Sequence, residues 1–436
     1  MSELRSSAPT ARRSQILSWA LWDFGATGLN AVVVTFVFSI YLTNSVGDGL
    51  PGDTSATSWL GWALGGAGLT VALFAPLTGV WVDAPWRRRR ALAVLTASTV
   101  TLTSAMSLIR EDYRYLAVGL LLVAAASASN DLASVPYNAM LRQLSTPKTS
   151  GQISGLGMGL GFFGSVVLLL VVYFGFVTGD GGLLGVPVAD GQNVRAAMLF
   201  TAIWFGLFAL PLLISAPSPK PDPLQERAAA GFFGGYRTLW AEVRNEWRRD
   251  HNVVYYLIAS AVFRDGLTGV FAFGAVLGVK VYGVSQADVL LFGVSASVVA
   301  AVGAVVGGRL DDRLGAKPVI VGALTAMIVV AGILMTLSGV LAFWICGLLL
   351  CLFIGPTLSA ARTLMLRMSA DGKEGVAFGL YTTTGRAVSY LAPVLFSTFI
   401  AVFGTERAGM GGLIVVLAVG LLAMLAVKTP GRVAAD

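Results

Sequence analysis

The chain has 436 residues, of which 56% are hydrophobic and only 12% are charged, and its mean hydropathy is +0.77. A soluble domain carries about 25% charged residues, so this composition excludes a soluble protein and indicates a chain that lies mostly within a membrane. The formal net charge of +7 does not indicate nucleic-acid binding, because basic runs such as Arg87–Arg90 lie between apolar segments, as in a cytoplasmic loop.

Residues that carry catalytic or metal chemistry are scarce. Cys346 and Cys351 are the only cysteines, and they form neither a disulfide framework nor a zinc spacing. The single histidine, His251, lies at the edge of an apolar segment, as an interfacial side chain would. No Walker loop, HExxH or GxSxG motif occurs. We therefore predict no metal, no cofactor and no enzyme activity.

Apolar stretches long enough to cross a bilayer recur along the whole chain. The first follows a basic tail but is too long for a signal peptide and contains Asp23, so we interpret it as an uncleaved membrane helix. The predicted helices are residues 15–43, 57–82, 89–109, 115–139, 150–177, 195–215, 252–280, 287–308, 317–337, 341–362, 374–402 and 408–428.

One long polar stretch divides six of these segments from the other six. It contains four prolines and then a Trp-containing basic piece, for which we predict an amphipathic surface helix around Phe232–Trp247. The predicted organisation is a tail at 1–14, a six-helix half at 15–215, a linker at 216–251, a second six-helix half at 252–428 and a tail at 429–436.

Basic residues predict the orientation of the chain in the membrane. With the N-terminus inside, the predicted cytoplasmic stretches and helix ends hold 23 of the 30 Lys and Arg residues, the outer stretches hold five, and two lie within the membrane. This asymmetry predicts that both termini and the linker are cytoplasmic.

Several charged residues lie deep inside the predicted helices. Asp23 shares a helix face with Thr27 and Asn30, at i+4 and i+7. Asp131 likewise shares a face with Asn138. A charge at such depth is costly unless it is paired or faces a water-filled cavity. We interpret both carboxylates as proton-binding or substrate-binding groups, with structural packing as the alternative for each.

The seventh and eleventh segments carry charges near the bilayer midplane, namely Arg264, Asp265 and Arg386. A pair between Asp265 and either Arg386 or Arg264 would cancel charge, and proton binding would then compete with the ion pair. This would couple a proton to a conformational change, whereas a permanent structural brace is the alternative. Tyr381 is a further candidate for the cavity wall, although core or lipid contact is an open alternative.

The fifth segment carries a run of closely spaced glycines. Small residues let membrane helices approach closely, so the run predicts tight packing rather than ligand binding. It is not a dinucleotide fingerprint, because no strand precedes it and it lies in the membrane. Its members are Gly155, Gly157, Gly159, Gly161 and Gly164.

The two halves repeat one another at their cytoplasmic turns. Gly79–Arg90 and Gly307–Lys317 both have Gly-x-x-x-Asp followed by a tight basic turn, 228 residues apart. Matching turns in two six-helix halves are typical of a parallel repeat around a central cavity. We interpret residues of these two turns, with one arginine from each of two further cytoplasmic turns, as elements of a gate that stabilises one facing state. They are Gly79, Asp83, Arg87, Arg142, Gly307, Asp311, Arg313 and Arg367. Arg142 and Arg367 are the predicted partners of the two aspartates, and a topology anchor is the alternative role.

These turns resemble the signature loop of the major facilitator superfamily. Four stretches, Ser18–Gly25, Val135–Leu141, Ser154–Gly164 and Phe378–Arg386, resemble the branch of the fungal vacuolar amino-acid effluxer of autophagy and its bacterial relatives. The chain departs from that branch at Ala26–Thr27, at Arg142 and at Arg264. The resemblance implies a twelve-helix all-α fold in which helices 1, 4, 7 and 10 line the cavity.

The predicted function is secondary active transport of a small solute by alternating access, coupled to protons. The expected cargo is an amino acid or an amphipathic metabolite or drug, exported across the plasma membrane by a monomer. A non-transporting sensor or scaffold is the alternative, and an intramembrane enzyme lacks the residues it needs. The expected partners are a small-molecule substrate, protons and the lipid bilayer, without nucleic acid.

Overall fold

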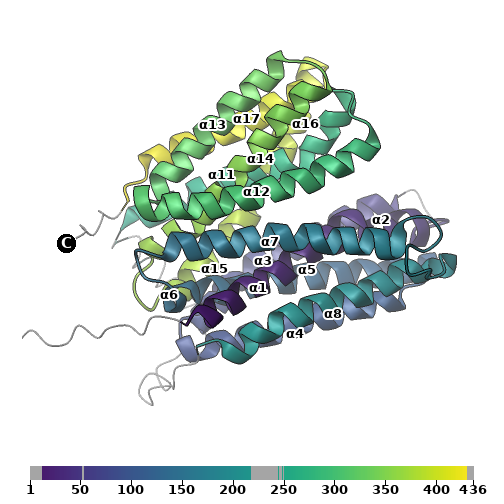
Figure 1. Ribbon diagram of the computed structural model, residues 1–436, viewed down its shortest axis with the longest axis horizontal. Helices are drawn as coiled ribbons and strands as arrows, with labels where there is room; N and C mark the ends of the chain where they lie inside the picture. Colours follow the sequence, from purple (N-terminus) through teal and green to yellow (C-terminus); the bar gives the residue numbers. More distant parts are fainter. Residues whose placement is uncertain (1–11, 52–53, 218–243, 245–247, 249, 430–436) are drawn as a thin grey trace, which may run out of the picture.

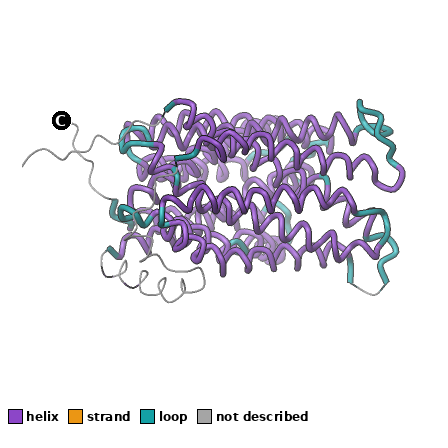
Figure 2. Tube along the Cα trace, turned by 90° about the horizontal axis from the view of Figure 1, so that it is seen from below, coloured by secondary structure: helices purple, strands orange, loops and turns teal. Residues whose placement is uncertain are grey.

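A computed structural model describes residues 12–51, 54–217, 244, 248 and 250–429. All regular structure in these ranges is helical, without a strand (Figures 1 and 2). Twelve helical spans are long and apolar enough to cross a membrane, which confirms the predicted all-α membrane fold. The amphipathic helix predicted around Phe232–Trp247 falls largely outside the described residues.

Six spans form the N-terminal half. The first span is broken, because π-helical segments at Asn30–Phe36 and Leu42–Val46 flank a short helix. The α-helices of this half are α1 (Arg13–Leu29), α2 (Phe38–Tyr41), α3 (Ala56–Val82), α4 (Pro85–Ala105), α5 (Leu116–Ala139), α6 (Leu141–Leu144), α7 (Ser150–Val172) and α8 (Gln192–Ser215).

Six further spans form the C-terminal half. Its eleventh span also breaks, between Val388 and Leu391, just before Pro393. Proline lacks the N–H that would bond to the carbonyl of Ser389, so the helix stops and restarts there. The helices are α11 (His251–Lys280), α12 (Gln286–Leu314), α13 (Ala316–Thr336), α14 (Val340–Met368), α15 (Glu374–Val388), α16 (Leu391–Phe403) and α17 (Ala408–Ala426).

The two halves meet at one end of the bundle and diverge toward the other (Figure 1). We call the first the signature-loop end, because it holds the turns at 83–84, 145–149, 315 and 369–373. The two most extensive crossings between the halves are α15 against α3 and α7 against α12. The orientation prediction makes the signature-loop end cytoplasmic.

The glycine run of α7 packs as the sequence predicts. Gly157, Gly161 and Gly164 lie against α1, where an added Cβ would meet Trp19, Thr27 or Phe24 respectively. Gly155 and Gly159 lie against backbone atoms of α12 in the other half. Helix α7 therefore packs closely against α1 of its own half and against α12 of the other half, through alternate glycines.

Two helix ends lie six residues beyond their predicted positions. The eighth span continues to Leu314 rather than 308, and the tenth continues to Met368 rather than 362. The extra turns carry Asp311 and Arg367, and Arg362 lies immediately before the second of them; the side chains of all three are buried or half-buried. Their polar groups are satisfied by ion pairs, so hydropathy alone does not locate these helix ends.

Candidate functional site

The crossing of α3 and α15 is built on two glycines. A Cβ on Gly79 would meet the carbonyl oxygen of Gly375, and the converse also holds, so no larger residue fits at either position. The Asp83 carboxylate accepts a hydrogen bond from the Val376 N–H (3.0 Å) and lies 3.8 Å from the Lys373 ammonium. Asp83 therefore caps the first turn of a helix that belongs to the opposite half.

Asp83 is mostly buried at this crossing, with 15% of its side chain exposed. Burial raises the pKa of the Asp83 carboxyl to about 7, against the opposing effects of the Val376 N–H and Lys373. The carboxyl therefore changes its charge near neutral pH while it holds the two halves together.

Glu374 lies at the centre of a buried ion-pair cluster beside this crossing. Its carboxylate accepts from Arg88 Nη2 at 2.8 Å and from Arg142 Nε at 3.0 Å. Arg88 is 1% exposed and also donates to the carbonyls of Val82 and Ala139. Both arginines belong to the N-terminal half and Glu374 to the other, so the cluster closes the signature-loop end across the halves.

The crossing of α7 and α12 repeats the same design. An added Cβ on Gly151 would meet the carbonyl oxygen of Gly308 at 2.5 Å. The Asp312 carboxylate accepts from the backbone N–H groups of Gly151 (2.7 Å) and Gln152 (2.8 Å), at the start of α7. In each crossing, therefore, an aspartate of one half caps a helix of the other.

Asp311, the neighbour of Asp312, is almost fully buried and pairs inside its own half. It accepts from Arg367 Nη1 at 2.5 Å and from the Thr363 hydroxyl. Arg367 also donates to the Ser150 hydroxyl of the N-terminal half (3.0 Å). The predicted pairing of Asp311 with Arg367 is thus present, and Arg367 extends it across the halves.

The other predicted gate residues have contacts that differ from the predicted ones. Arg142 does not pair with Asp83 as predicted; it pairs with Glu374, the first residue of α15, and with Asp371 in the turn before that helix. Gly307 packs on Pro356 within its own half, so Gly308 is the cross-half glycine. Arg87 lies 6.0 Å from the Trp81 ring, and Arg313 is exposed.

The cluster at the signature-loop end is the first layer of contact between the halves. A second layer lies about 9 Å farther from that end, at a residue six positions before the end of α14. There Arg362 Nη2 donates to the Asp23 carboxylate at 3.3 Å, and both residues are buried. Thr27 donates to the same carboxylate (3.3 Å), as the shared helix face predicts. Arg362 is not among the predicted site residues, because the predicted tenth helix ends at that residue.

Aromatic rings of the N-terminal half cover this pair. Trp19 and Tyr137 stack with ring centroids 4.5 Å apart, and the Arg362 guanidinium lies 5.4 and 5.5 Å from their respective centroids. The Trp19 indole N–H donates to the Tyr137 carbonyl (3.0 Å). Rings and carboxylate together hold a cation from the other half in a dry site.

A third layer lies about 18 Å from the signature-loop end, twelve residues into α15. Arg386 Nη2 forms an ion pair with the Asp131 carboxylate of α5. Their side chains are 35% and 22% exposed, so solvent reaches this pair more than the Arg362–Asp23 pair of the second layer, whose side chains are 9% and 12% exposed. The predicted pairs of Asp265 with Arg386 or Arg264 are wrong, because Arg386 reaches across the halves to Asp131.

Asp265 instead accepts from the Ala392 N–H at 2.6 Å and is buried. This N–H lies in the first turn of α16, just after the helix break, so Asp265 acts as a cap supplied by a neighbouring helix. Arg264 donates to the Tyr381 carbonyl (2.6 Å) and lies over the Tyr381 ring (3.5 Å). Among the described residues, Arg264 has no carboxylate within 4.0 Å.

The two asparagine candidates lie apart from these pairs. Asn138 is buried, and its side-chain oxygen accepts no hydrogen bond from any described group. Asn30 is exposed at the start of the first π-helical segment. Within the described ranges, no three His, Cys, Asp or Glu side chains lie close enough to hold a metal ion.

Three layers of charge therefore join the halves along one axis, and each pairs an acid and a base from opposite halves. Six deep charges balance: Asp23, Asp131 and Asp265 against Arg264, Arg362 and Arg386. Among the described residues, every hydrogen bond and ion pair between the halves lies at the third layer or nearer to the signature-loop end. Separating the halves at that end therefore breaks all of these bonds together.

Sequence comparison identifies relatives along nearly the whole chain. The profile of the family described as "Vacuole effluxer Atg22 like" matches residues 55–434. An uncharacterised transporter of the major facilitator type, YxiO of Bacillus subtilis, is 20% identical over 93% of this chain and 92% of its own length. Autophagy-related protein 22 of Cryptococcus neoformans is 24% identical over 66% of this chain, which spans about half (53%) of that protein.

Solved structures match the fold. The proton:xylose symporter XylE superimposes with a TM-score of 0.70 at 17% identity, covering 94% of this chain and 93% of that one. A bacterial homologue of the iron transporter ferroportin, in an outward-facing state, superimposes with a TM-score of 0.64 at 15% identity, covering 94% and 97%.

Proposed function

The chain belongs to the Atg22-like branch of the major facilitator superfamily and is a multi-pass membrane transporter, and from this premise we propose that it is a proton-coupled exporter working by alternating access. The cross-half ion pair of Asp131 and Arg386 is the observation that carries the proposal. It is more exposed than the Asp23–Arg362 pair and lies farthest from the signature-loop end, toward the side where the halves diverge.

Proton binding and this ion pair exclude one another. A proton that arrives from the open side neutralises Asp131 and releases Arg386, so the halves lose one of the bonds that hold the signature-loop end closed. A substrate's ammonium group competes with the proton for the Asp131 carboxylate, while its anionic group binds Arg386 or Arg264. Because a proton and an ammonium group cannot occupy that carboxylate together, proton and substrate alternate at one site, as an antiporter requires.

The cargo we propose is a small zwitterion, such as an amino acid, or an amphipathic metabolite. Arg264 supplies a second cation with no carboxylate within 4.0 Å among the described residues, which suits the carboxylate of such a solute. We also propose that the protein exports its cargo across the plasma membrane as a monomer, with cytoplasmic termini and without catalysis.

Proteoliposomes that contain a pH-sensitive dye test the coupling. Amino acids, dipeptides and amphipathic cations are added in turn to wild type, to Asp131→Asn and to Asp180→Asn as a matched control in an exposed outer loop. We expect a solute-triggered pH change in wild type and the control that Asp131→Asn abolishes. Solute flux without a pH change, equal in all three proteins, would contradict proton coupling.

A further inference from the structure

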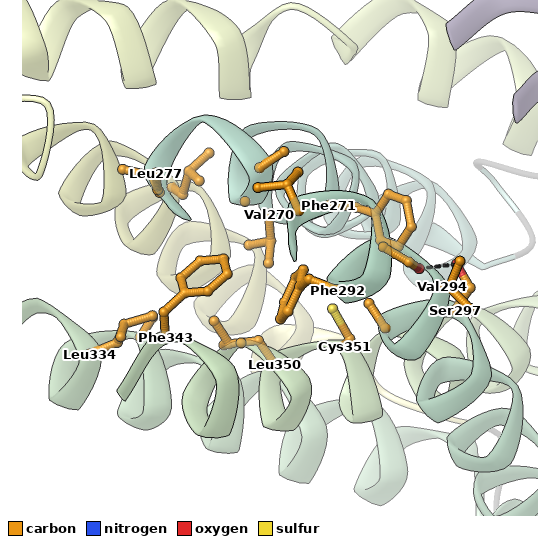
Figure 3. Close-up of a pocket in the computed structure, with 18 of the residues that line it drawn as sticks. Val270, Phe271, Leu277, Phe292, Val294, Ser297, Leu334, Phe343, Leu350 and Cys351 are labelled. Atoms are coloured by element: carbon orange, nitrogen blue, oxygen red, sulfur yellow. Dashed lines mark hydrogen bonds between the residues drawn. The ribbon is translucent and has the colours of Figure 1, made fainter. Parts of the chain in front are cut away.

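A cavity of about 340 Å³ lies among α11, α12 and α14, away from the charged layers. Its wall is almost wholly apolar, and Figure 3 shows Phe292, Phe343 and Cys351 around the same space. The hydroxyl of Ser297, one of the few polar groups of the wall, already donates to the Gly293 carbonyl (2.9 Å). The volume lies in the range of small-molecule sites, and the wall selects a hydrocarbon group.

Both halves of the protein build this cavity. The N-terminal half contributes Ala31 and Phe36 from the first π-helical segment and Leu169 from α7. Phe36 and Phe271 are 47% and 41% exposed, so the cavity reaches the surface beside these two rings. Because the halves move against one another during transport, an occupant contacts a wall that changes with the facing state.

The cavity also lies directly beyond the charged layers on two helices. Phe271 follows Arg264 by seven residues on one face of α11, which is about 10 Å along the axis. Ala31 follows Asp23 by eight residues along the first span, or about 12 Å. A molecule of that length can place a polar group at the arginines and an apolar group in the cavity.

We propose that this cavity is the apolar subsite of the transport site, so that the substrates are amphipathic zwitterions or anions with a bulky hydrocarbon or aromatic group. The inference rests on the proposed function. It assigns the polar end of the substrate to Arg264 and Arg386, and the apolar end to the space beside Phe292. A lipid acyl chain is the other source of a hydrocarbon group, and the experiment separates the two.

Two glycines of the wall allow the cavity to be filled without a clash. A side chain at Gly274 or Gly293 would meet no atom within 4 Å, since both face open space. Gly322 of α13 is a matched control, because it is also helical and unobstructed but lies outside the cavity. The three variants are Gly274→Leu, Gly293→Leu and Gly322→Leu.

The probes are dipeptides of constant charge and increasing apolar bulk: Gly-Gly, Leu-Leu and Phe-Phe. We expect wild type to transport Phe-Phe with a lower KM than Gly-Gly. Either filling variant should raise the KM for Phe-Phe at least tenfold and leave Gly-Gly unchanged, since one or two lost hydrocarbon contacts have effects of that size. An equal Phe-Phe KM in all four proteins overturns the proposal.

Occupancy can be measured without transport. Replacing Cys346 with Ser leaves Cys351, in the cavity wall, as the only thiol of the chain. We expect Phe-Phe to slow its reaction with N-ethylmaleimide at least tenfold, and Gly-Gly to leave the rate unchanged. Protection without transport supports the subsite while the proposed function fails. A labelling rate that responds to removal and return of phospholipid but to no dipeptide identifies an acyl-chain site and overturns the proposal.

Discussion

Replacing Glu374 with Gln tests whether the buried cluster holds the signature-loop end closed. The change removes the charge that pairs with Arg88, which is 1% exposed, and with the partly exposed Arg142. An unpaired buried charge costs about 3–5 kcal/mol. When that end opens, both arginines reach water, so the cost applies to the closed conformation alone. The open conformation should therefore gain a factor of about 10² or more.

Spin labels report this shift as a distance. In a background with both cysteines replaced by Ser, Gln152→Cys and Arg313→Cys carry the labels at exposed positions on α7 and α12. We expect Glu374→Gln to convert the short distance into a longer one. Glu406→Gln is the matched control, because Glu406 pairs with Lys280 (2.8 Å) at the surface and within one half. A Glu374→Gln distribution identical to wild type would refute the reasoning.

Three further predictions use the same label pair. In an Asp131→Asn background, which removes the opposite effect of protonating Asp131, lowering the pH from 8 to 5 should favour the closed form by about 2–3 kcal/mol. The closed state raises the Asp83 pKa to about 7 from an ordinary value near 3.9, so protonation below pH 7 stabilises the closed state relative to the open one. Additional Asp83→Asn should remove this pH dependence, and a pH dependence that persists in that variant would contradict the prediction. Gly155→Val places carbon atoms against the Ala304 carbonyl of α12 and should favour the open form by about 1–3 kcal/mol, while Gly322→Val should have no effect; equal shifts would count against the crossing. Arg362→Gln leaves the buried Asp23 carboxylate without its cation and should favour the open form by about 3–5 kcal/mol; additional Asp23→Asn should restore part of the loss, and purely additive effects would exclude the pair.

The fold could be predicted from the sequence because the bilayer constrains it strongly. Each crossing helix needs about 20 apolar residues, so hydropathy locates all twelve spans. The glycine run of α7 also predicts its own packing, because small residues in membrane helices mark close approach. The helix ends near Asp311 and Arg367 were harder, since charged residues there remain helical when partners in other helices satisfy them.

The partners of the deep charges could not be predicted from the sequence. Asp131 and Arg386 are 255 residues apart, and their pairing depends on how the two halves dock. Asp265 accepts a hydrogen bond from a backbone N–H that has no partner within its own helix, because the eleventh span breaks just before Pro393. Charge balance could have indicated one missing residue. The sequence places three acids but only two arginines deep in the membrane, so a third deep cation was expected, and Arg362 is that cation.

Cross-linking the signature-loop end tests alternating access most directly. In the background without native cysteines, a short bis-maleimide joins Gln152→Cys on α7 to Arg313→Cys on α12, across the crossing that Asp312 caps. We predict that the cross-linked protein transports no solute, whereas the same protein treated with a monofunctional maleimide keeps its activity. Full transport by the cross-linked protein would contradict the account, because the solute would then cross without separation of the halves.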